Sequence, residues 1–357
     1  MDASRLRAEF PVFERLAYLN AGTCGPLPAA ARRAIDEVVD LAEVDGRRGA
    51  YYDRFLALRD RQREAYAGLL GAAAEDVALT TSTSDGIARV VGGLDLRQGD
   101  EILTAEDEHP GLLGPLLGAR MRSGIAIVTA PLAELPERVG PRTKLVACSH
   151  VGWVSGAVAP RLDAGDVPLL LDGAQGVGAV PVDVAGLGCA FYAGAGQKWL
   201  CGPVGTGMLY VSPAWRERLK TVTLAYPSYE DASRGLDPAA LHAGARRHDA
   251  AAMAPELAAA ALAAIDVLAA FGWDRVHERG RTLARALAER LREAGRTVAP
   301  RGETTLVAWE DPDPEATAER LGAAGVAVRF LPGTKYLRAS VGAWNDESDL
   351  ERLLAAL

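Results

Sequence analysis

The feature of this sequence that most restricts its fold is a series of short apolar runs separated by helical or loop segments. Each run has four to six residues, the usual length of a buried β-strand. Alternation of such runs with helices predicts an α/β domain with a mostly parallel, seven-stranded sheet. The runs lie at residues 77–80, 101–104, 125–129, 144–149, 168–172, 190–193 and 207–211.

Two helical patterns precede the first run, and a different arrangement follows residue 255. Two long helices, several short strands and a closing helix predict a smaller α+β unit there. We therefore predict a large domain at residues 15–250 and a small domain formed by residues 1–14 and 251–357. The expected helices lie at about 28–49, 54–70, 255–271, 274–294 and from 346 onward, and the late strands lie near 304–309, 326–330 and 336–341.

Composition and charge argue against several classes of protein. Of the 357 residues, 49% are apolar and 24% charged, which is typical of a soluble globular protein. The net charge of −8 and the absence of a Lys/Arg cluster argue against a nucleic-acid partner. The Ala-rich stretch 250–271 contains Glu256 and Asp266, which favours a packed helix over a membrane span. Residues 1–13 lack a signal-peptide pattern, so we expect a cytoplasmic protein. The four cysteines have no paired C-x-x-C spacing and predict no metal site; they are Cys24, Cys148, Cys189 and Cys201.

Two motifs follow predicted strands. Asp172 ends the run 168–172, at the edge of a parallel sheet where ligands bind, although it could also be a simple helix cap. Lys198 lies in the glycine-rich stretch 194–207, where small neighbours allow close approach and partial desolvation favours Schiff-base chemistry. A solvent-exposed lysine on a glycine loop is the alternative. The apolar neighbours Trp199 and Leu200 favour a buried lysine instead.

A third motif, Thr-Thr-Ser-Thr-Ser-Asp-Gly at residues 80–86, lies between a predicted strand and a helical run. Hydroxyls and free N–H groups at a helix N-terminus form an anion site, although a plain cap remains the alternative. A phosphate site, a carboxylate for a pyridine nitrogen and a lysine for an aldehyde are together what is needed to hold pyridoxal 5′-phosphate (PLP). The combination predicts a PLP-dependent enzyme acting at the α-carbon of an amino acid.

With these motifs the sequence resembles the fold-type I PLP-dependent enzymes of the class V aminotransferase family, which includes cysteine desulfurases and isopenicillin N epimerase. The resemblance covers nearly the whole chain. It is strongest over Asp-Gly-Ala-Gln-Gly-Val-Gly-Ala-Val-Pro-Val-Asp-Val at 172–184 and Gly-Gln-Lys-Trp-Leu-Cys-Gly-Pro at 196–203.

The resemblance implies a role for each matching residue around the cofactor. Lys198 would be the Schiff-base lysine, Asp172 the partner of the pyridine nitrogen, and Gln175 a contact of the ring hydroxyl. His109, in Glu-His-Pro-Gly, would stack on the ring face; an ordinary helix-capping histidine is the alternative. The phosphate would be held by three residues, Thr83, Ser84 and Gln197.

The resemblance also implies the substrate site and a homodimer. Arg338 would form a two-pronged pair with the substrate carboxylate, a geometry that only arginine offers, and Arg329 would be a second arginine of the site. A surface arginine on a strand is the alternative for Arg338. Cys24 lies in the N-terminal segment that lines the substrate side of the pocket in the family, so we expect a packing or substrate-contact residue there.

Several positions depart from the family pattern. Ala195 and Ala251-Ala252 replace residues that reach the phosphate in many relatives, so we expect fewer protein contacts to the phosphate than usual. Trp153 stands where cysteine desulfurases tend to carry an asparagine. The surroundings of the cofactor ring therefore resemble those of the epimerase-like branch more. The loop between Arg329 and Arg338 is short and has no cysteine, which argues against a conventional sulfur donor that works through a persulfide.

The favoured reaction is β-elimination from a cysteine-type or S-conjugated substrate. This preference rests on analogy with class V members that act as carbon–sulfur lyases. The same residues would also serve an aminotransferase or an epimerase-like enzyme, and a catalytically inactive PLP-fold scaffold is a further alternative. The sequence leaves the substrate side chain and the fate of the α-carbanion open.

Overall fold

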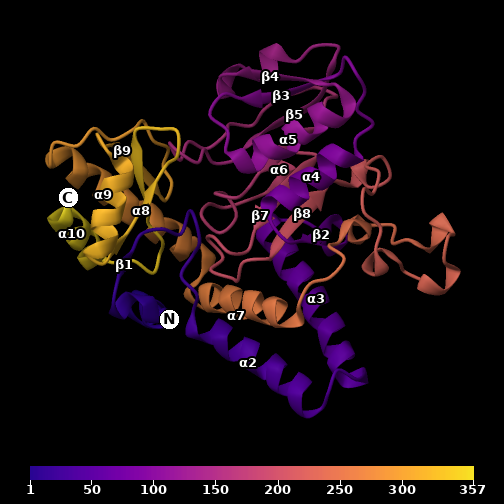
Figure 1. The fold of residues 1–357 in the computed structure, drawn as a ribbon, viewed down its shortest axis with the longest axis horizontal. Coiled ribbons are helices and arrows are strands. Elements are labelled where there is room, and N and C mark those ends of the chain that lie inside the picture. The colour runs from indigo at the N-terminus through magenta and orange to yellow at the C-terminus, as the bar shows by residue number, and fades with distance from the viewer.

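The computed structural model describes residues 1–357 and places the seven predicted strands in one sheet, in the order β2-β8-β7-β6-β5-β3-β4 (Figure 1). β8 is antiparallel to both of its neighbours, whereas the pairs among β3 to β7 are parallel. The prediction of a mostly parallel seven-stranded sheet is therefore confirmed. The strands are β2 (Val77–Thr80), β3 (Glu101–Ala105), β4 (Ala126–Ala130), β5 (Thr143–Ser149), β6 (Leu169–Asp172), β7 (Phe191–Ala195) and β8 (Gly207–Val211).

Helices cover both faces of this sheet because successive strand residues point to opposite sides. Leu169 and Leu171 of β6 share a core with Tyr66 and Leu70 of α3, whereas Leu170 packs in a second core built on α4 and α5. The segment 150–168 contains no helix, as its short spacing implies. The helices of this part are α1 (Ala3–Ala8), α2 (Ala29–Val44), α3 (Gly49–Leu70), α4 (Thr83–Gly93), α5 (Pro110–Ser123) and the single turn α6 (Val184–Leu187).

A buried ion-pair cluster fixes the β2 edge of the sheet to α3. The carboxylate of Asp249 accepts bonds from Arg59 (2.8 Å) and Arg63 (2.7 and 3.0 Å), and also from the backbone N–H of Leu79 in β2 (2.9 Å). Its side chain is 0% exposed. The cluster therefore holds the strand that leads into the first turn of α4. Residues 212–254, which carry Asp249, form an irregular segment with five short 3₁₀ turns, most of it projecting from the body in Figure 1.

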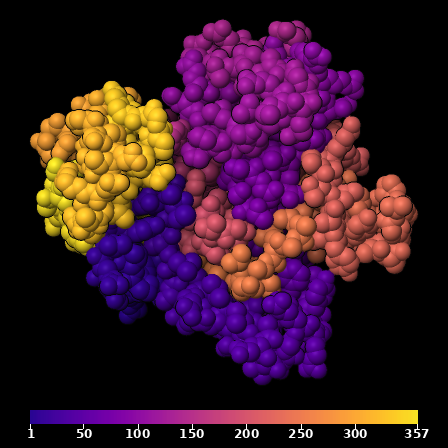
Figure 2. Space-filling view, in the orientation of Figure 1, coloured from indigo at the N-terminus to yellow at the C-terminus, as the bar shows by residue number.

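The C-terminal unit is α+β, as predicted. It has a three-stranded antiparallel sheet in the order β11-β12-β9. Figure 2 shows this unit (yellow) beside the N-terminal segment (indigo). Its elements are α8 (Trp273–Glu293), β9 (Leu306–Glu310), α9 (Pro314–Ala323), β10 (Val326–Ala327), β11 (Arg329–Phe330), β12 (Tyr336–Ser340) and α10 (Glu347–Ala356).

The Ala-rich stretch forms α7 (Pro255–Phe271), which packs against α2 and α3 with most of its residues buried. No single helix of the protein is long and apolar enough to cross a membrane; α7 and α8 meet the length and composition only as a pair, and that pair is bent by 81°.

The N-terminal segment belongs physically to the C-terminal unit. β1 (Ala17–Tyr18) pairs with β10, and Ala17 and Leu19 lie in the same core as Trp309 and Leu337. The division of the chain into two domains is a proposal, and these contacts lead us to move its N-terminal boundary from residue 15 to about residue 20.

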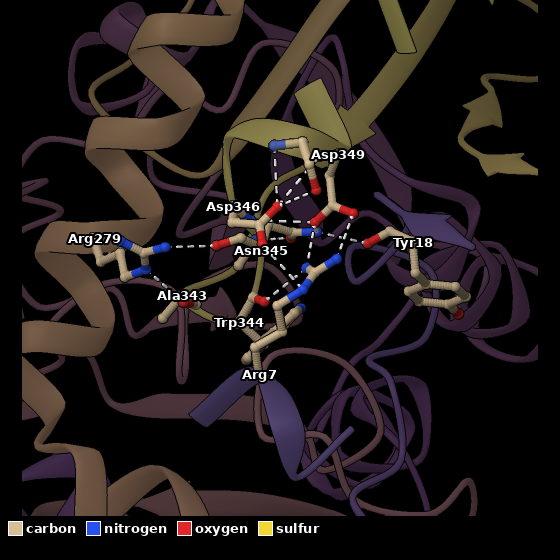
Figure 3. Close-up of polar contacts among 10 residues, drawn as sticks. Arg7, Tyr18, Arg279, Ala343, Trp344, Asn345, Asp346 and Asp349 are labelled. Carbon is tan, nitrogen blue, oxygen red and sulfur yellow. Dashed lines mark hydrogen bonds and ion pairs between the residues drawn. The ribbon is translucent and has the colours of Figure 1, made fainter. Parts of the chain in front are cut away.

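A polar cluster secures this association (Figure 3). Arg7 binds both carboxylate oxygens of the fully buried Asp349 at 2.7 and 3.0 Å and pairs with Asp346 at 3.1 Å. Asn345 donates to the Tyr18 carbonyl at 3.1 Å and to Asp349 at 2.9 Å. The cluster thereby fixes the segment that continues to residues 22 and 23, which line the cavity described next.

Candidate active site

A cavity of about 370 Å³ opens where the sheet, the N-terminal segment and the C-terminal unit meet. It lies at the carboxyl ends of the parallel strands, the edge where open α/β sheets bind ligands. Its lining combines residues from distant parts of the chain: Gly22, Thr23, His109, Pro110, Trp153, Gln175, Lys198, Arg329, Leu331, Pro332 and Arg338. Five of these were predicted as site residues from the sequence.

Lys198 lies in the loop after β7 and is the only one of the four lysines that is not exposed. Burial, together with the nearby charge of Arg338, lowers the pKa of Lys198 to about 8, despite the opposing effects of Asp172 and Cys24. The N-terminal segment packs tightly on this loop: Gly25 donates to the Gln197 carbonyl at 2.7 Å, and a Cβ at Gly25 would lie 2.1 Å from the Lys198 carbonyl oxygen. The alternative of a solvent-exposed lysine is therefore wrong.

Asp172 ends β6 and is 5% exposed. One of its oxygens accepts the N–H of Ala174 at 2.9 Å, and no Lys or Arg forms an ion pair with it. Burial raises the pKa of Asp172, while the charge of Lys198 opposes that rise. A buried carboxylate without a bound cation is costly, so its position suits a cationic ring nitrogen.

His109 is the N-cap of α5 and also lines the cavity. Its Nδ1 accepts the N–H of Gly111 at 2.9 Å, so the capping alternative is correct as a local description. Burial and the charges of Lys198, Arg338 and Arg329 lower the pKa of His109 to about 4. The imidazole is therefore neutral at physiological pH and lines the cavity, and its predicted stacking on a cofactor ring stays a prediction.

Gln175 is buried and connects two walls of the cavity. Its amide nitrogen donates to the Gly22 carbonyl at 2.8 Å, and its oxygen accepts the indole N–H of Trp199 at 2.9 Å. The amide is thereby held in a fixed orientation against the N-terminal segment. Its predicted contact with a ring hydroxyl stays a prediction.

Two of the predicted phosphate residues, Thr83 and Ser84, lie at the first turn of α4, whereas Gln197 lies in the loop after β7; none of the three lines the cavity. The hydroxyl of Thr83 is buried without a partner, and so is the side-chain oxygen of Gln197. The Ser84 hydroxyl donates to the Gly111 carbonyl at 2.8 Å. Free helical N–H groups beside unpaired polar atoms are the arrangement in which a phosphate binds.

Arg338 and Arg329 face each other across the β11–β12 pair. Arg338 is 3% exposed, donates to the Trp153 carbonyl at 2.7 Å and has a buried Nε without a partner. Burial, together with the charge of Arg329, lowers the pKa of Arg338 to about 10. The surface-arginine alternative is wrong for Arg338, because the side chain is buried and lines the cavity.

Cys24 is partly buried and does not line the cavity; its neighbours Gly22 and Thr23 do. Its carbonyl accepts the Tyr18 hydroxyl at 3.0 Å and its N–H donates to the Asn20 carbonyl at 3.1 Å. These contacts involve only the backbone of Cys24, so the choice between a packing and a substrate-contact residue stays a prediction.

Two residues near the centre were not among the predicted site residues. Trp153 packs edge-on to His109 with ring centroids 5.1 Å apart, and only its departure from the family pattern drew attention to it. Glu108, the neighbour of His109 in the chain, is buried and accepts both the N–H and the hydroxyl of Ser149. Burial raises the pKa of Glu108 to about 7, with the charges of Asp172 and Asp107 adding to the effect. The only sequence signal for Glu108 was its position next to His109.

The residues present fit PLP. The buried Lys198 matches the aldehyde of PLP, and the Asp172 carboxylate, which has no ion-pair partner, matches the pyridine nitrogen. The neutral imidazole of His109 matches the ring, and the unpaired polar atoms beside the N-terminus of α4 match the phosphate. The fold and this site define a PLP-dependent enzyme of fold type I.

Residues 25–353 match the family model described as Aminotransferase class-V, and the chain belongs to that family. It is 30% identical to isopenicillin N epimerase of Streptomyces clavuligerus, over 91% of this chain and 84% of that protein. It is 31% identical to a probable cysteine desulfurase of Methanothermobacter thermautotrophicus, over 65% of this chain and 62% of that protein.

Among solved structures, the chain is similar to the cystine C-S lyase C-DES in complex with its reaction product cysteine persulfide. The TM-score is 0.91 at 26% identity, and the match covers 97% of this chain and 98% of the other. The similarity extends over both the sheet and the C-terminal unit. The predicted family and cofactor are confirmed.

Proposed function

We propose that the protein is a PLP-dependent carbon–sulfur β-lyase that acts on cysteine-type or S-conjugated amino acids. The observation that carries the proposal is the wall between Arg329 and Arg338. Leu331 and Pro332 line the cavity there, and the whole loop contains no thiol that could take sulfur from a substrate. Similarity to a cystine C-S lyase over nearly the whole chain supports the same reaction.

Bound PLP would hold the substrate amine and accept the electrons released at the α-carbon. Arg338 would bind the α-carboxylate, since it is buried, fixed by the Trp153 carbonyl and free of acidic partners. The Asp172 carboxylate would face the ring nitrogen and favour its protonated form.

Lys198 would act as the general base at the α-carbon. A pKa lowered to about 8 leaves more neutral amine at neutral pH than an exposed lysine has. Nζ of Lys198 would take the α-proton, the Cβ–S bond would break with its electron pair on sulfur, and the proton would pass from Nζ to the departing sulfur. The products would be 2-aminoacrylate, which water converts to pyruvate and ammonia, and a thiol, or a persulfide where the substrate is a disulfide.

Incubation of the holoenzyme with cysteine, cystine and S-substituted cysteines tests the proposal. We expect stoichiometric pyruvate, ammonia and sulfur-containing product, and none with Lys198→Ala. Parallel incubations with 2-oxo acids and with enantiopure amino acids would detect amino transfer and epimerisation. Either of those activities without pyruvate would contradict the lyase assignment, and the similarity to isopenicillin N epimerase makes epimerisation the main competitor. A cytoplasmic location and a homodimer remain predictions.

A further inference from the structure

Trp153 is held in the cavity by contacts with three other residues. Its indole N–H donates to the Asp107 carbonyl at 3.1 Å, and its own carbonyl accepts an N–H of Arg338 at 2.7 Å. The indole packs edge-on to the His109 ring, with an interplanar angle of 81°. Because its N–H group is already bonded, the indole offers only apolar surface to the cavity that it lines.

The loop that carries Trp153 is fixed as well. Gly152 donates to the Ala157 carbonyl and Gly156 donates to the Gly152 carbonyl, both at 2.8 Å, which closes the loop on itself. The hydroxyl of Thr304, in the C-terminal unit, donates to the Gly156 carbonyl at 2.8 Å. A shift of the indole away from a ligand would therefore cost bonds to both the large domain and the C-terminal unit.

The contacts of Trp153 place it beside the carbon atoms at which the reaction would occur. Arg338 would bind the α-carboxylate, and His109 is predicted to stack on the cofactor ring that holds the substrate amine. The α-carbon joins the carboxylate to the amine, so Trp153, which contacts both residues, would lie next to the first side-chain atom, the β-carbon. A fixed ring at this position limits the width of the side chain at the β-carbon, because extra methyl groups forced against a rigid wall are unfavourable.

We propose that Trp153 is a specificity-determining residue that excludes amino acids branched at the β-carbon. The substrates are then amino acids whose sulfur is carried by an unbranched CH₂ group. This inference rests on the proposed lyase function for the sulfur in the substrate, whereas the selection against branching can be tested on binding alone.

S-Ethylcysteine and S-ethylpenicillamine test the inference in turnover, because they differ only by two methyl groups on the β-carbon. Both release ethanethiol on elimination, so one assay measures both. We expect the holoenzyme to favour S-ethylcysteine by at least about tenfold in kcat/KM, the usual effect of one additional methylene against a pocket wall. Trp153→Ala should raise kcat/KM for S-ethylpenicillamine and bring the two substrates to within about twofold of each other.

Two further variants complete this comparison. Trp153→Phe keeps an aromatic ring beside His109, so its selection should lie between those of wild type and Trp153→Ala, and it provides the test if the alanine variant does not fold. Trp215→Phe is the matched control, because Trp215 packs on Phe191 outside the lining of the cavity; it should leave the ratio of the two substrates unchanged.

A binding experiment separates this inference from the reaction. Norvaline and valine are isomers without a leaving group that differ only in branching at the β-carbon, and their dissociation constants are measurable from the visible absorption of the bound cofactor. We expect norvaline to bind about tenfold more tightly, and we expect Trp153→Ala to lose this preference. If the preference holds but no substrate releases a thiol, the lyase function fails and the role of Trp153 stands. Equal binding of the two isomers by wild type would overturn that role, as would an equal loss of both in Trp153→Ala, which would make the indole a purely structural support.

Discussion

Replacement of Asp249 by asparagine should destabilise the protein by about 3–5 kcal/mol at pH 7, the usual cost of breaking a buried ion pair from one side. The carboxylate is 0% exposed, and its partners Arg59 and Arg63 are 3% and 6% exposed. Asparagine keeps the volume but leaves two guanidinium groups without a counter-charge. It also keeps only one oxygen to serve both arginines and the Leu79 N–H.

The pH dependence gives a second, independent check. Burial alone would raise the pKa of Asp249, but bonds and charges from Arg63 and Arg59 and the Leu79 N–H outweigh it and hold the pKa below its usual value. Such a depressed pKa stabilises the protein fully above about pH 4, and this contribution is lost as the pH falls through the folded-state pKa. The difference between wild type and Asp249→Asn should therefore shrink in acid.

Urea unfolding at several pH values, followed by circular dichroism, measures both effects. Asp266→Asn is the matched control, because Asp266 is exposed on α7 without an ionic partner; it should change the stability by less than about 0.5 kcal/mol. A loss below about 1 kcal/mol for Asp249→Asn, or a difference that does not change with pH, would refute the reasoning.

Three further predictions concern the site and its support. Cofactor-free protein should take up PLP faster as the pH rises through about 8, because burial lowers the pKa of Lys198 to about 8 and the neutral amine is the nucleophile. Stopped-flow absorbance would measure the rate of uptake at each pH, and a midpoint near pH 10.5 would contradict the prediction. Arg338→Lys should raise the KM of amino-acid substrates at least about tenfold, because lysine keeps the charge but cannot form the two-pronged bond. Steady-state kinetics would measure the change, with Arg54→Lys, at an exposed arginine, as the control variant. An unchanged KM would argue against carboxylate binding at Arg338. Asp349→Asn should lower the free energy of unfolding by about 3 kcal/mol, because asparagine is a weaker partner for Arg7. A variant as stable as wild type would show that the cluster of Figure 3 does not hold the N-terminal segment.

The central sheet was predictable because each strand is a short, continuous apolar run. All seven runs became strands, with ends shifted by at most two residues. The direction of β8 was not in that pattern. Only 11 residues join β7 to β8, and they contain no helix, whereas a parallel return needs a longer crossover. Spacing could therefore have shown that β8 is antiparallel.

Elements that depend on distant partners escaped prediction. The expected strand near 326–330 is divided, because β10 pairs with β1 and β11 pairs with β12. The helix α9 was missed because it buries only Leu321 and so has weak periodicity, although Asp313 and Pro314 form a recognisable start.

The site was predictable where a residue follows a strand end. Asp172 is the last residue of β6, and Lys198 and His109 lie in the loops after β7 and β3, at the edge where the sheet brings loops together. Gly22 and Thr23 reach the cavity only because Arg7 and β1 hold the N-terminal segment to the C-terminal unit, a contact across more than 300 residues that no local pattern records.

Attachment of PLP to Lys198 is the central claim, and chemical reduction tests it most directly. Purified protein would be treated with borohydride, digested and analysed by mass spectrometry for a pyridoxyl group on lysine. The chain has four lysines, and Lys144, Lys220 and Lys335 are all exposed and paired with acids. The account predicts loss of the visible absorption band and a single modified peptide that contains Lys198. A pyridoxyl group on one of the other three lysines, or on none, would contradict it.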